Sequence, residues 1–228
     1  DTPVRIVEGM NLYNFYIRDY AGVNPSNGEG LFWHHEFDED GNIIPGQSTL
    51  TSNRANGSYI YAGSPEPKAT GGFNTNISWK GLTLSAFFEF VYGNKVMTGN
   101  WYITDGEDVF SQNSQSSALN YWKQPGDTGV YPKPIAGGSN VWYAGYSTRF
   151  LEDGSYLRIK DVTLSYNLPE KWVKAIKMSG VKLYVSALNP YTFHHVNAFD
   201  PEMGPVGYAY GGNHTMVKSF VGGVEVSF

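Results

Sequence analysis

The chain contains no cysteine, so disulfide bonds and thiolate metal sites are both excluded. Charged residues are scarce, at 16% of 228 residues, and the net charge of -5 leaves no basic surface for a polyanion. No apolar run approaches the roughly 20 residues that a membrane-spanning helix needs. A signal peptide is also missing, since the chain opens on Asp1 to Arg5, and we expect a mature product or an internal piece of a longer protein.

Aromatic residues and glycine are abundant instead. The chain has 17 tyrosines, 13 phenylalanines and 6 tryptophans, together with 27 glycines and 12 prolines. Glycine and proline at this frequency indicate turns and long loops, and the tryptophans and tyrosines of those loops argue against disorder. A chain of this length can bury a sizeable core, as one large domain or two small ones.

The last ten residues alternate in character. One parity holds the large apolar residues Phe220, Val224, Val226 and Phe228. The other parity is mostly small or polar, and because successive strand residues point to opposite faces, the segment has one apolar face. An uncovered soluble edge of this kind invites aggregation, and a barrel with that face against lipid removes the problem. The pattern therefore predicts a strand of an outer-membrane barrel that ends at the aromatic girdle.

A hairpin pattern surrounds Gly81. Before it, Phe73, Ile77 and Trp79 alternate with polar residues, and after it every second residue from Leu82 to Tyr92 is apolar. Each arm has about ten residues, the length that a tilted strand needs to cross a bilayer. In a large barrel the polar face lines a wet lumen.

Six main strands are predicted, roughly over residues 11–23, 70–80, 82–96, 155–168, 180–190 and 216–228. The turns after Lys80 and Leu168 are short, and the connections after Val23, Val96 and Asn189 are long. Short periplasmic turns that alternate with long external loops are typical of outer-membrane barrels. Six strands cannot close such a barrel, for which eight is the lower limit. The predicted fold class is all-β, a sector of an antiparallel transmembrane β-barrel with long extracellular loops.

Three local features are predicted within this framework. The apolar parity of the fourth strand switches between Ile159 and Val162, which indicates a bulge. Residues 169–177 have the pattern of a short amphipathic helix. Gly30 to Trp33 can pair with the residues that follow the turn-rich run 38–42, as a small hairpin.

Two motifs invite a metal-site interpretation. The run 38–42 resembles the start of a calcium loop, but its twelfth position is Thr49, where a glutamate would be required, and a hairpin turn is preferred. Histidines stand in adjacent pairs at 34–35 and 194–195. Adjacent strand residues point to opposite faces and cannot chelate together, so exposed loop histidines are expected. No metal site is predicted.

Asp200 and Glu202 place two carboxylates in one loop, which formally suits acid–base work on a glycoside. Nothing else in the sequence supplies an organised glycosidase cleft, and a structural role for the loop is preferred. No Ser-His-Asp spacing, phosphate-binding loop or nucleic-acid stripe stands out. The chain is therefore predicted not to be an enzyme, and no cofactor is predicted.

Aromatic side chains of the predicted external loops are the candidate ligand contacts. They are Trp101, Tyr102, Tyr121, Trp122, Trp142, Tyr143, Tyr146, Tyr208 and Tyr210. Flat rings with a polar tip suit sugar faces and peptide side chains alike. The alternative is that these residues pack loops together or form the membrane girdle.

Several stretches resemble SusC-like, TonB-dependent outer-membrane transporters of the Bacteroidetes. Residues 60–74 resemble the region before a late barrel strand of that family, and residues 151–169 resemble it as well. Residues 181–189, followed by 199–202 and the terminal Phe228, are similar to the family's ending. The resemblance covers nearly the whole chain, in the right order.

The resemblance implies the last six strands of a 22-stranded barrel, the plugged class of transporter, with the plug domain and earlier strands missing from this chain. It also implies a SusD-like surface lipoprotein as a hinged lid, and TonB as the energy source through the absent plug. The substrate would be an oligosaccharide or oligopeptide, imported without any bond being made or broken. This chain would supply barrel wall in contact with outer-membrane lipid, outer loops that contact substrate, and part of the lid-docking surface.

Two other classes stay open from the residues alone. One is a passive or adhesive outer-membrane barrel without energy coupling. The other is a secreted, soluble β-sandwich that binds carbohydrate. The sandwich predicts that the rows Phe73/Ile77/Trp79 and Leu84/Phe88/Phe90 pack against a second sheet.

Overall fold

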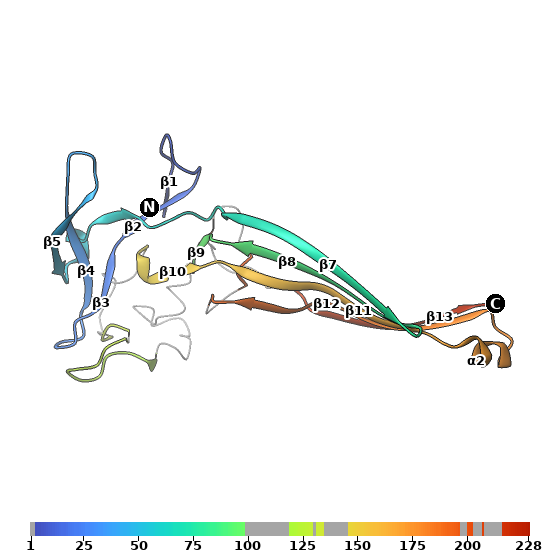
Figure 1. Ribbon diagram of the computed structural model, residues 1–228. Helices are drawn as coiled ribbons and strands as arrows, with labels where there is room; N and C mark the ends of the chain where they lie inside the picture. Colours follow the sequence, from blue (N-terminus) through green and yellow to red (C-terminus); the bar gives the residue numbers. More distant parts are fainter. Residues whose placement is uncertain are drawn as a thin grey trace. The chain divides into compact units, whose positions relative to one another are not determined.

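The computed structural model describes residues 3–98, 119–129, 131–134, 146–196, 200–202, 207 and 216–228. The chain forms two compact units, each made of segments that are far apart in sequence. One unit comprises residues 1–66, 95–152 and 203–213, and the other comprises residues 67–94, 153–202 and 214–228. We call the first the loop unit and the second the sheet unit, and describe each separately (Figure 1).

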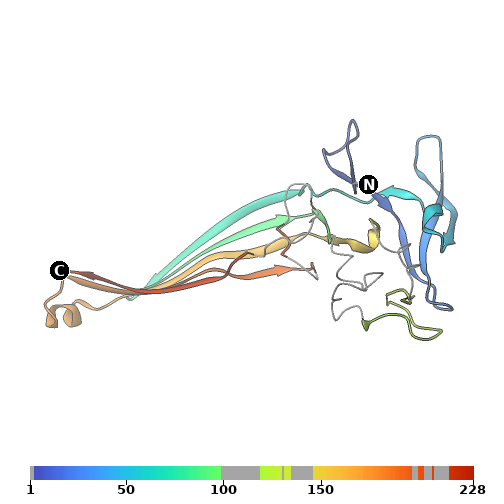
Figure 2. The ribbon, with the colours of Figure 1, turned by 180° about the vertical axis from the view of Figure 1, so that it is seen from behind.

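The sheet unit is built on five long antiparallel strands in the order β13-β12-β11-β8-β7. The strands are β7 (Ala69–Trp79), β8 (Leu82–Tyr92), β11 (Tyr156–Asn167), β12 (Gly180–His194) and β13 (Ser219–Ser227). Figures 1 and 2 show them as a curved, twisted ribbon seen from its two sides. Strands of 11 to 15 residues, such as β7 and β12, extend over about 35–50 Å at roughly 3.4 Å per residue. A tilt of about 40° brings the shorter ones close to the roughly 25 Å height of a barrel's apolar band.

The register of the sheet places apolar residues together in rows across the strands. Phe73 lies opposite Phe88, which lies opposite Ile159, which in turn lies opposite Tyr191. The rings of Phe73 and Phe88 are stacked with centroids 4.6 Å apart. Because side chains alternate along every strand, the same register gathers polar residues on the opposite face.

The strand β11 carries the predicted bulge. Its register shifts between Ile159 and Asp161 against both of its neighbours, β8 and β12. An extra residue at this point moves the apolar parity from odd to even numbers, so Ile159 and Val162 face the same side. The prediction of a bulge between these two residues is confirmed.

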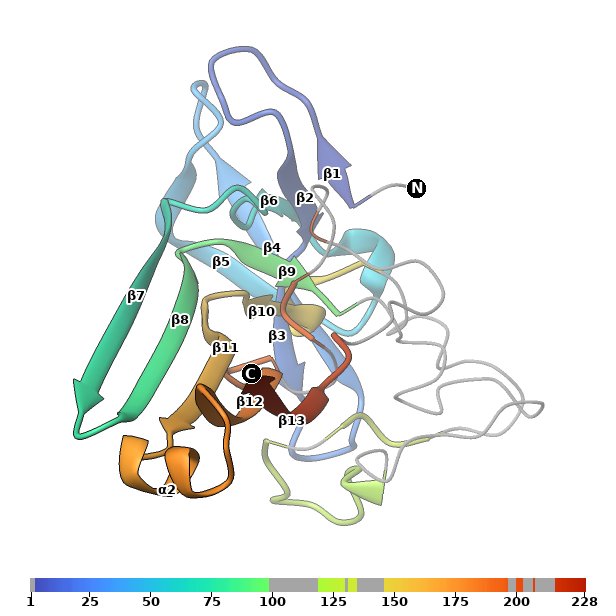
Figure 3. The same ribbon diagram turned by 90° about the vertical axis from the view of Figure 1, so that its right-hand side faces the viewer.

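One end of the sheet carries short connections. The β7–β8 turn consists of Lys80 and Gly81, both with positive φ (48° and 84°), and Figure 3 shows the two strands joined by this tight turn. The helix α2 (Glu170–Ala175) connects β11 to β12, with Pro169 at its N-cap. The short helix predicted over residues 169–177 is therefore present. Among the described residues, no helix has the length and hydropathy of a membrane-spanning helix.

Two neighbouring glycines of β13 meet different surroundings. Gly223 lies opposite Tyr184 of β12, and a Cβ at this glycine would be 2.5 Å from the ring and hydroxyl of that tyrosine. A Cβ at Gly222, on the other face, would meet nothing closer than 3.9 Å. The tyrosine ring therefore occupies the space that a side chain at Gly223 would need.

We expect Gly223→Ala to destabilise the folded protein by about 1–3 kcal/mol, since overpacking forces the Tyr184 ring away from its position. Gly222→Ala is the matched control and should change the free energy of unfolding by less than about 0.5 kcal/mol. The measurement is the urea midpoint of the full-length protein, followed by tryptophan fluorescence. The double variant Tyr184→Ala/Gly223→Ala should recover part of the loss, and equal midpoints for the two single variants would contradict this packing.

The loop unit consists of three small sheets, two of three strands and one of two strands. Their strands are β1 (Val4–Arg5), β2 (Asn14–Arg18) and β6 (Tyr59–Tyr61); β3 (Tyr20–Val23), β4 (Gly30–Phe37) and β5 (Ile43–Thr51); and β9 (Lys95–Met97) and β10 (Leu151–Asp153). Two short 3-10 turns, η1 (Arg54–Asn56) and η4 (Thr148–Phe150), complete the unit. Its core is a cluster of Phe15, Ile17, Met97 and Phe150. The small hairpin predicted after residue 30 is confirmed, because β4 pairs with β5.

The prediction of one strand over residues 11–23 is wrong. This stretch forms β2 and β3, which belong to different sheets of the loop unit. The two strands separate at Asp19, whose backbone N–H donates to Ser58, while the N–H of Tyr20 donates to the Thr148 hydroxyl. Gly22, at a φ of 111°, then shifts the register of β3. These contacts hold the stretch within the loop unit, in place of a sixth strand of the long sheet.

The bounds of the other strands differ from the expected ones at their ends. The strand expected over 82–96 ends at Tyr92, because Gly93 has a φ of 81°, and the chain then enters β9. The strand expected over 180–190 continues to His194, which lies opposite Tyr156. The terminal strand begins at Ser219 rather than at residue 216.

Candidate functional site

The sheet unit has one apolar face that is open to its surroundings. Phe73, Ile77 and Trp79 of β7 have exposed fractions of 51%, 60% and 67%. The same face continues over the other strands with Leu84, Leu164, Leu183, Val185, Tyr191, Phe193, Phe220, Val224, Val226 and Phe228. A continuous exposed apolar surface of this kind needs a partner, and a barrel wall in a membrane has one in lipid.

These exposures disagree with the soluble sandwich, which places the same rows under a second sheet. The terminal row shows the disagreement most clearly, since Phe220 and Val224 are among the most exposed apolar side chains of the sheet. The predicted terminal-strand residues Phe220, Val224, Val226 and Phe228 therefore lie on the open apolar face.

The opposite face of the sheet holds a buried arginine within a cluster of carboxylates. Arg158 on β11 is completely buried, and its guanidinium donates to Asp200 and, at 2.6 Å, to Glu202. Its Nε donates to the Thr192 hydroxyl of β12 at 2.9 Å. The Arg158 guanidinium thus holds the 200–202 segment against strand β11, although the residues that it joins are 42 to 44 positions apart in sequence.

A second cation joins this cluster. The Nζ of Lys160 lies 2.7 Å from Glu89 of β8 and 3.5 Å from Glu202. Burial works to raise the pKa of the Asp200 carboxyl, but the backbone N–H of Glu202 and the Arg158 guanidinium outweigh it, and the pKa lies below its ordinary value of 3.8. Asp200 is therefore held as an anion. The pairing of both carboxylates with Arg158 supports the structural interpretation of the Asp200/Glu202 motif over the glycosidase one.

The histidines and the acidic turn also have structural partners. His35 was expected to be an exposed loop histidine, and this prediction is wrong. It is a mostly buried residue of β4, and its ring nitrogens lie 2.8 Å from the Ser48 hydroxyl and 3.0 Å from the Asp19 carboxylate. His34 points to the other side of β4 and contacts the Asn56 carbonyl. Asp38 accepts the N–H of Asn42 at 2.7 Å, so the hairpin-turn interpretation is confirmed. In the described ranges, no group of three metal-ligating side chains occurs.

The Asp19–His35–Ser48 chain has the residue types of a hydrolase triad, but no spacing along the sequence points to it. The three side chains come from the β2–β3 junction and two neighbouring strands. The Asp19 carboxylate also accepts a hydrogen bond from the Thr148 hydroxyl at 3.2 Å. The backbone N–H of His35 donates to the Ser58 hydroxyl. These hydrogen bonds join β3, β4, β5 and η4. We interpret the group as a hydrogen-bond network that stabilises the loop unit.

An aromatic groove in the loop unit was not predicted. Tyr16 of β2 stacks on Tyr59 of β6 with ring centroids 5.2 Å apart, and lies 4.8 Å from the Tyr61 ring. Arg18 covers the other part of the Tyr59 ring at 4.4 Å. These side chains line a hollow of about 690 Å³, together with His34, Phe37 and Ile43.

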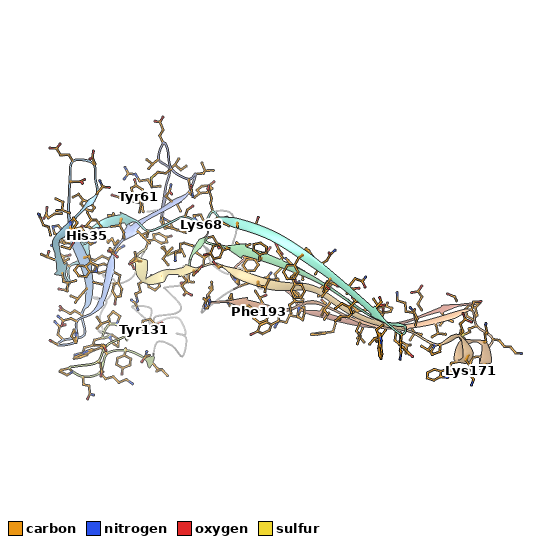
Figure 4. All side chains as sticks on the ribbon, viewed as in Figure 1. His35, Tyr61, Lys68, Tyr131, Lys171 and Phe193 are labelled. Carbon is orange, nitrogen blue, oxygen red and sulfur yellow. The ribbon has the colours of Figure 1, made fainter. Side chains whose placement is uncertain are left out.

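The groove arises from pairing that sequence spacing does not reveal. Tyr16 and Tyr61 are cross-strand partners, so two strands more than 40 residues apart bring their rings together. Tyr61 is exposed, and Figure 4 labels it within the loop unit. An aromatic surface with polar hydroxyl tips is suited to a sugar ring or to a peptide side chain.

Three of the predicted ligand contacts lie in the described part of the chain. Trp122 has an exposed fraction of only 7%, packs on Gly28, and donates its indole N–H to the Pro25 carbonyl at 3.2 Å. It therefore packs the loop, which is the alternative role considered for these aromatics. Tyr121 is half-buried, pairs with Tyr131, and has the Lys123 ammonium 5.4 Å from its ring. Tyr146 lies against the core of the loop unit.

The other predicted ligand contacts fall outside the described residues. They are Trp101, Tyr102, Trp142, Tyr143, Tyr208 and Tyr210.

Comparison with known proteins identifies the class of this fold. No family model matches the chain. TonB-dependent receptor P3 of Formosa agariphila is 27% identical over 237 residues, which cover 97% of this chain and 22% of the receptor. TonB-dependent receptor P26 of the same organism is 32% identical over 149 residues, which cover 63% of this chain and 14% of the receptor.

Solved structures agree with the sequence relatives. The RagAB peptide transporter matches 100% of this chain with a TM-score of 0.75 and 26% identity. The RagAB peptide importer in its 'open-open' state matches with a TM-score of 0.69 and 25% identity. The chain spans about a quarter of the length of these solved chains, and less of the curated relatives.

The RagA subunit of RagAB is SusC-like, and both receptors from Formosa agariphila carry the TonB-dependent name. Long antiparallel strands, an exposed apolar face and a polar opposite face are what a sector of such a barrel requires. The chain is accordingly a C-terminal portion of a SusC-like, TonB-dependent receptor of the outer membrane.

Proposed function

We propose that the protein to which this chain belongs imports oligosaccharides or oligopeptides across the outer membrane, with TonB as its source of energy. The observation that carries the proposal is that all of this chain matches a part of the RagAB peptide importer. Within that protein, the sheet unit supplies barrel wall. Residues 1–228 would then supply five of its last strands, β7, β8, β11, β12 and β13, together with outer loops, in a barrel of 22 strands.

The same similarity supports the partners that we propose. RagAB pairs its transporter with a SusD-like lipoprotein, and we propose that a SusD-like lid caps the present protein too. The plug and the earlier strands, which this chain does not include, would complete the lumen and receive the energy from TonB. The polar face of the sheet, with the Arg158 cluster, lines that lumen, and the outward face contacts lipid.

The loop unit is the proposed substrate-contacting part of this chain. Of the predicted ligand contacts, Trp101, Tyr121, Trp142, Tyr143, Tyr208 and Tyr210 stay proposals, and Tyr16, Tyr59 and Tyr61 are added from the groove. Trp122 is withdrawn from the set because its ring is buried against Gly28.

The proposed import is tested by deleting the gene for the full-length protein and measuring growth and uptake on candidate glycans and peptides. Loss of uptake of one class is the expected result, and unchanged uptake of all of them would contradict import.

For the substrate found in that test, we expect Tyr61→Ala to weaken binding about 2- to 10-fold. An aromatic contact contributes roughly 0.5–1.5 kcal/mol beyond the area that it buries. The measurement is titration calorimetry on the purified full-length protein. Tyr92→Ala is the matched control, because Tyr92 is also an exposed tyrosine but lies on the lipid-facing side of β8, so its loss should leave binding unchanged. Equal affinities of both variants would remove the groove from the substrate path.

A further inference from the structure

One end of the five-stranded sheet gathers lysine and tryptophan on short connections. The β7–β8 turn docks on the end of β11, where the N–H of Asn167 donates to the Gly81 carbonyl at 2.8 Å. Helix α2 follows β11 directly, and β12 then begins at Gly180, opposite Ser227 near the end of β13. Figure 4 labels Lys171 at this end of the sheet and Phe193 towards the other end.

This end has an excess of positive charge. Its lysines are Lys80, Lys171, Lys174, Lys177 and Lys182, and its acidic residues are Glu170 and Glu225. Both acidic residues form ion pairs with lysines of the same end: Glu170 lies 2.8 Å from Lys174, and Glu225 lies 3.8 Å from Lys182. Within the ranges that the structure covers, no carboxylate lies within salt-bridge distance of Lys80, Lys171 or Lys177. Three ammonium groups are therefore left for an anion.

Exposed apolar side chains accompany these ammonium groups. Trp172 and Ile176, one helical turn apart, have exposed fractions of 59% and 54%, while Val173 between them is buried and anchors α2. Trp79 is exposed on the outward face of β7, and the Lys80 ammonium lies 4.7 Å from its ring. Each of the two short connections thus presents a tryptophan next to an unpaired lysine.

We propose that this end of the wall binds the headgroups of anionic phospholipids, with Lys80, Lys171 and Lys177 contacting phosphate and Trp79 and Trp172 at the headgroup level. Tryptophan concentrates at membrane interfaces because one edge of its ring is polar and the rest apolar, and lysine is drawn to anionic headgroups. The apolar wall already requires lipid above this rim, so headgroups lie where the side chains are. The proposal rests on the barrel orientation given above, in which short turns face the periplasm and the lipid is the phospholipid of that leaflet.

The test uses the full-length transporter in nanodiscs of phosphatidylcholine with and without phosphatidylglycerol. Native mass spectrometry then counts the phosphatidylglycerol molecules that stay bound to the transporter when it is released from the nanodisc. We expect Lys171→Glu/Lys177→Glu to retain at least about tenfold less of it than the unmodified protein, since each lysine near an anionic surface changes affinity by about fivefold. Lys68→Glu/Lys218→Glu, two exposed lysines of the sheet unit that precede β7 and β13 and lie away from this rim, should retain the normal amount. Equal retention by both double variants would overturn the proposal.

A second readout needs no charge change. The difference in fluorescence between the unmodified protein and Trp172→Phe reports on Trp172 alone. Lipids brominated near the headgroup should quench that difference signal, and iodide should quench it weakly. Quenching by iodide without quenching by the brominated lipid would place Trp172 in water and overturn the proposal. Neither readout depends on transport, so a failed uptake experiment and a failed lipid experiment are distinguishable.

Discussion

Replacing Arg158 by methionine should cost about 3–5 kcal/mol of folding free energy, the range observed when one partner of a buried ion pair is removed. The side chain is completely buried, and its loss leaves Asp200 and Glu202 beside each other without their shared cation. The affected segment, 200–202, then loses its fastening to β11. The expected results are a lower urea midpoint of the full-length protein and faster proteolysis within residues 196–216.

The controls separate the charge from the packing. Lys182→Met removes an ion pair of the same face whose side chains are largely exposed, and should cost at most about 1 kcal/mol. The triple variant Arg158→Met/Asp200→Asn/Glu202→Gln removes the stranded charges and should regain much of the lost stability. A destabilisation by Arg158→Met no greater than that by Lys182→Met would show that the cluster does not fasten the segment.

Placing an arginine on the outward face should destabilise the inserted barrel. Val162 lies midway along β11 on the apolar face, opposite Ala86 of β8. Val162→Arg should destabilise the inserted protein by about 2–4 kcal/mol, the value for a cation near the bilayer midplane on the lipid side of a barrel. The measurement is urea unfolding of the full-length protein from lipid vesicles.

Ser85→Arg is the matched control for this variant. Ser85 is the residue before Ala86 on β8, at nearly the same depth, but it points to the polar face. In the proposed barrel an arginine there would face the water of the lumen, and it should cost less than about 1 kcal/mol. Equal destabilisation by the two variants would show that the two faces do not differ in solvent.

The long sheet was predictable because its pattern is local. Phe73, Ile77 and Trp79 alternate with polar neighbours within one segment, so parity alone indicates which side each faces. The bulge after Ile159 was also visible, since it inverts that parity within the same strand.

The loop unit was less predictable because its contacts join distant segments. The aromatic residues of 11–23 suggested one strand, but Asp19 breaks it through partners at Ser58 and Thr148, which lie far along the chain. The Tyr16–Tyr61 groove depends on the pairing of β2 with β6, and no spacing rule reports that pairing. For the same reason Arg158 could be placed on a strand, but its carboxylate partners could not be named.

The central claim is that lipid covers the outward face of these strands and water contacts the other. It is tested most directly by a spin label placed in turn at six consecutive residues of β12, 182–187, in the full-length protein in lipid vesicles. Labels at Leu183, Val185 and Ala187 should be accessible to dissolved oxygen, which concentrates in hydrocarbon. Labels at Lys182, Tyr184 and Ser186 should be accessible to a water-soluble nickel chelate. Low accessibility to both reagents at the first three positions, as beneath a second layer of protein, would contradict the claim.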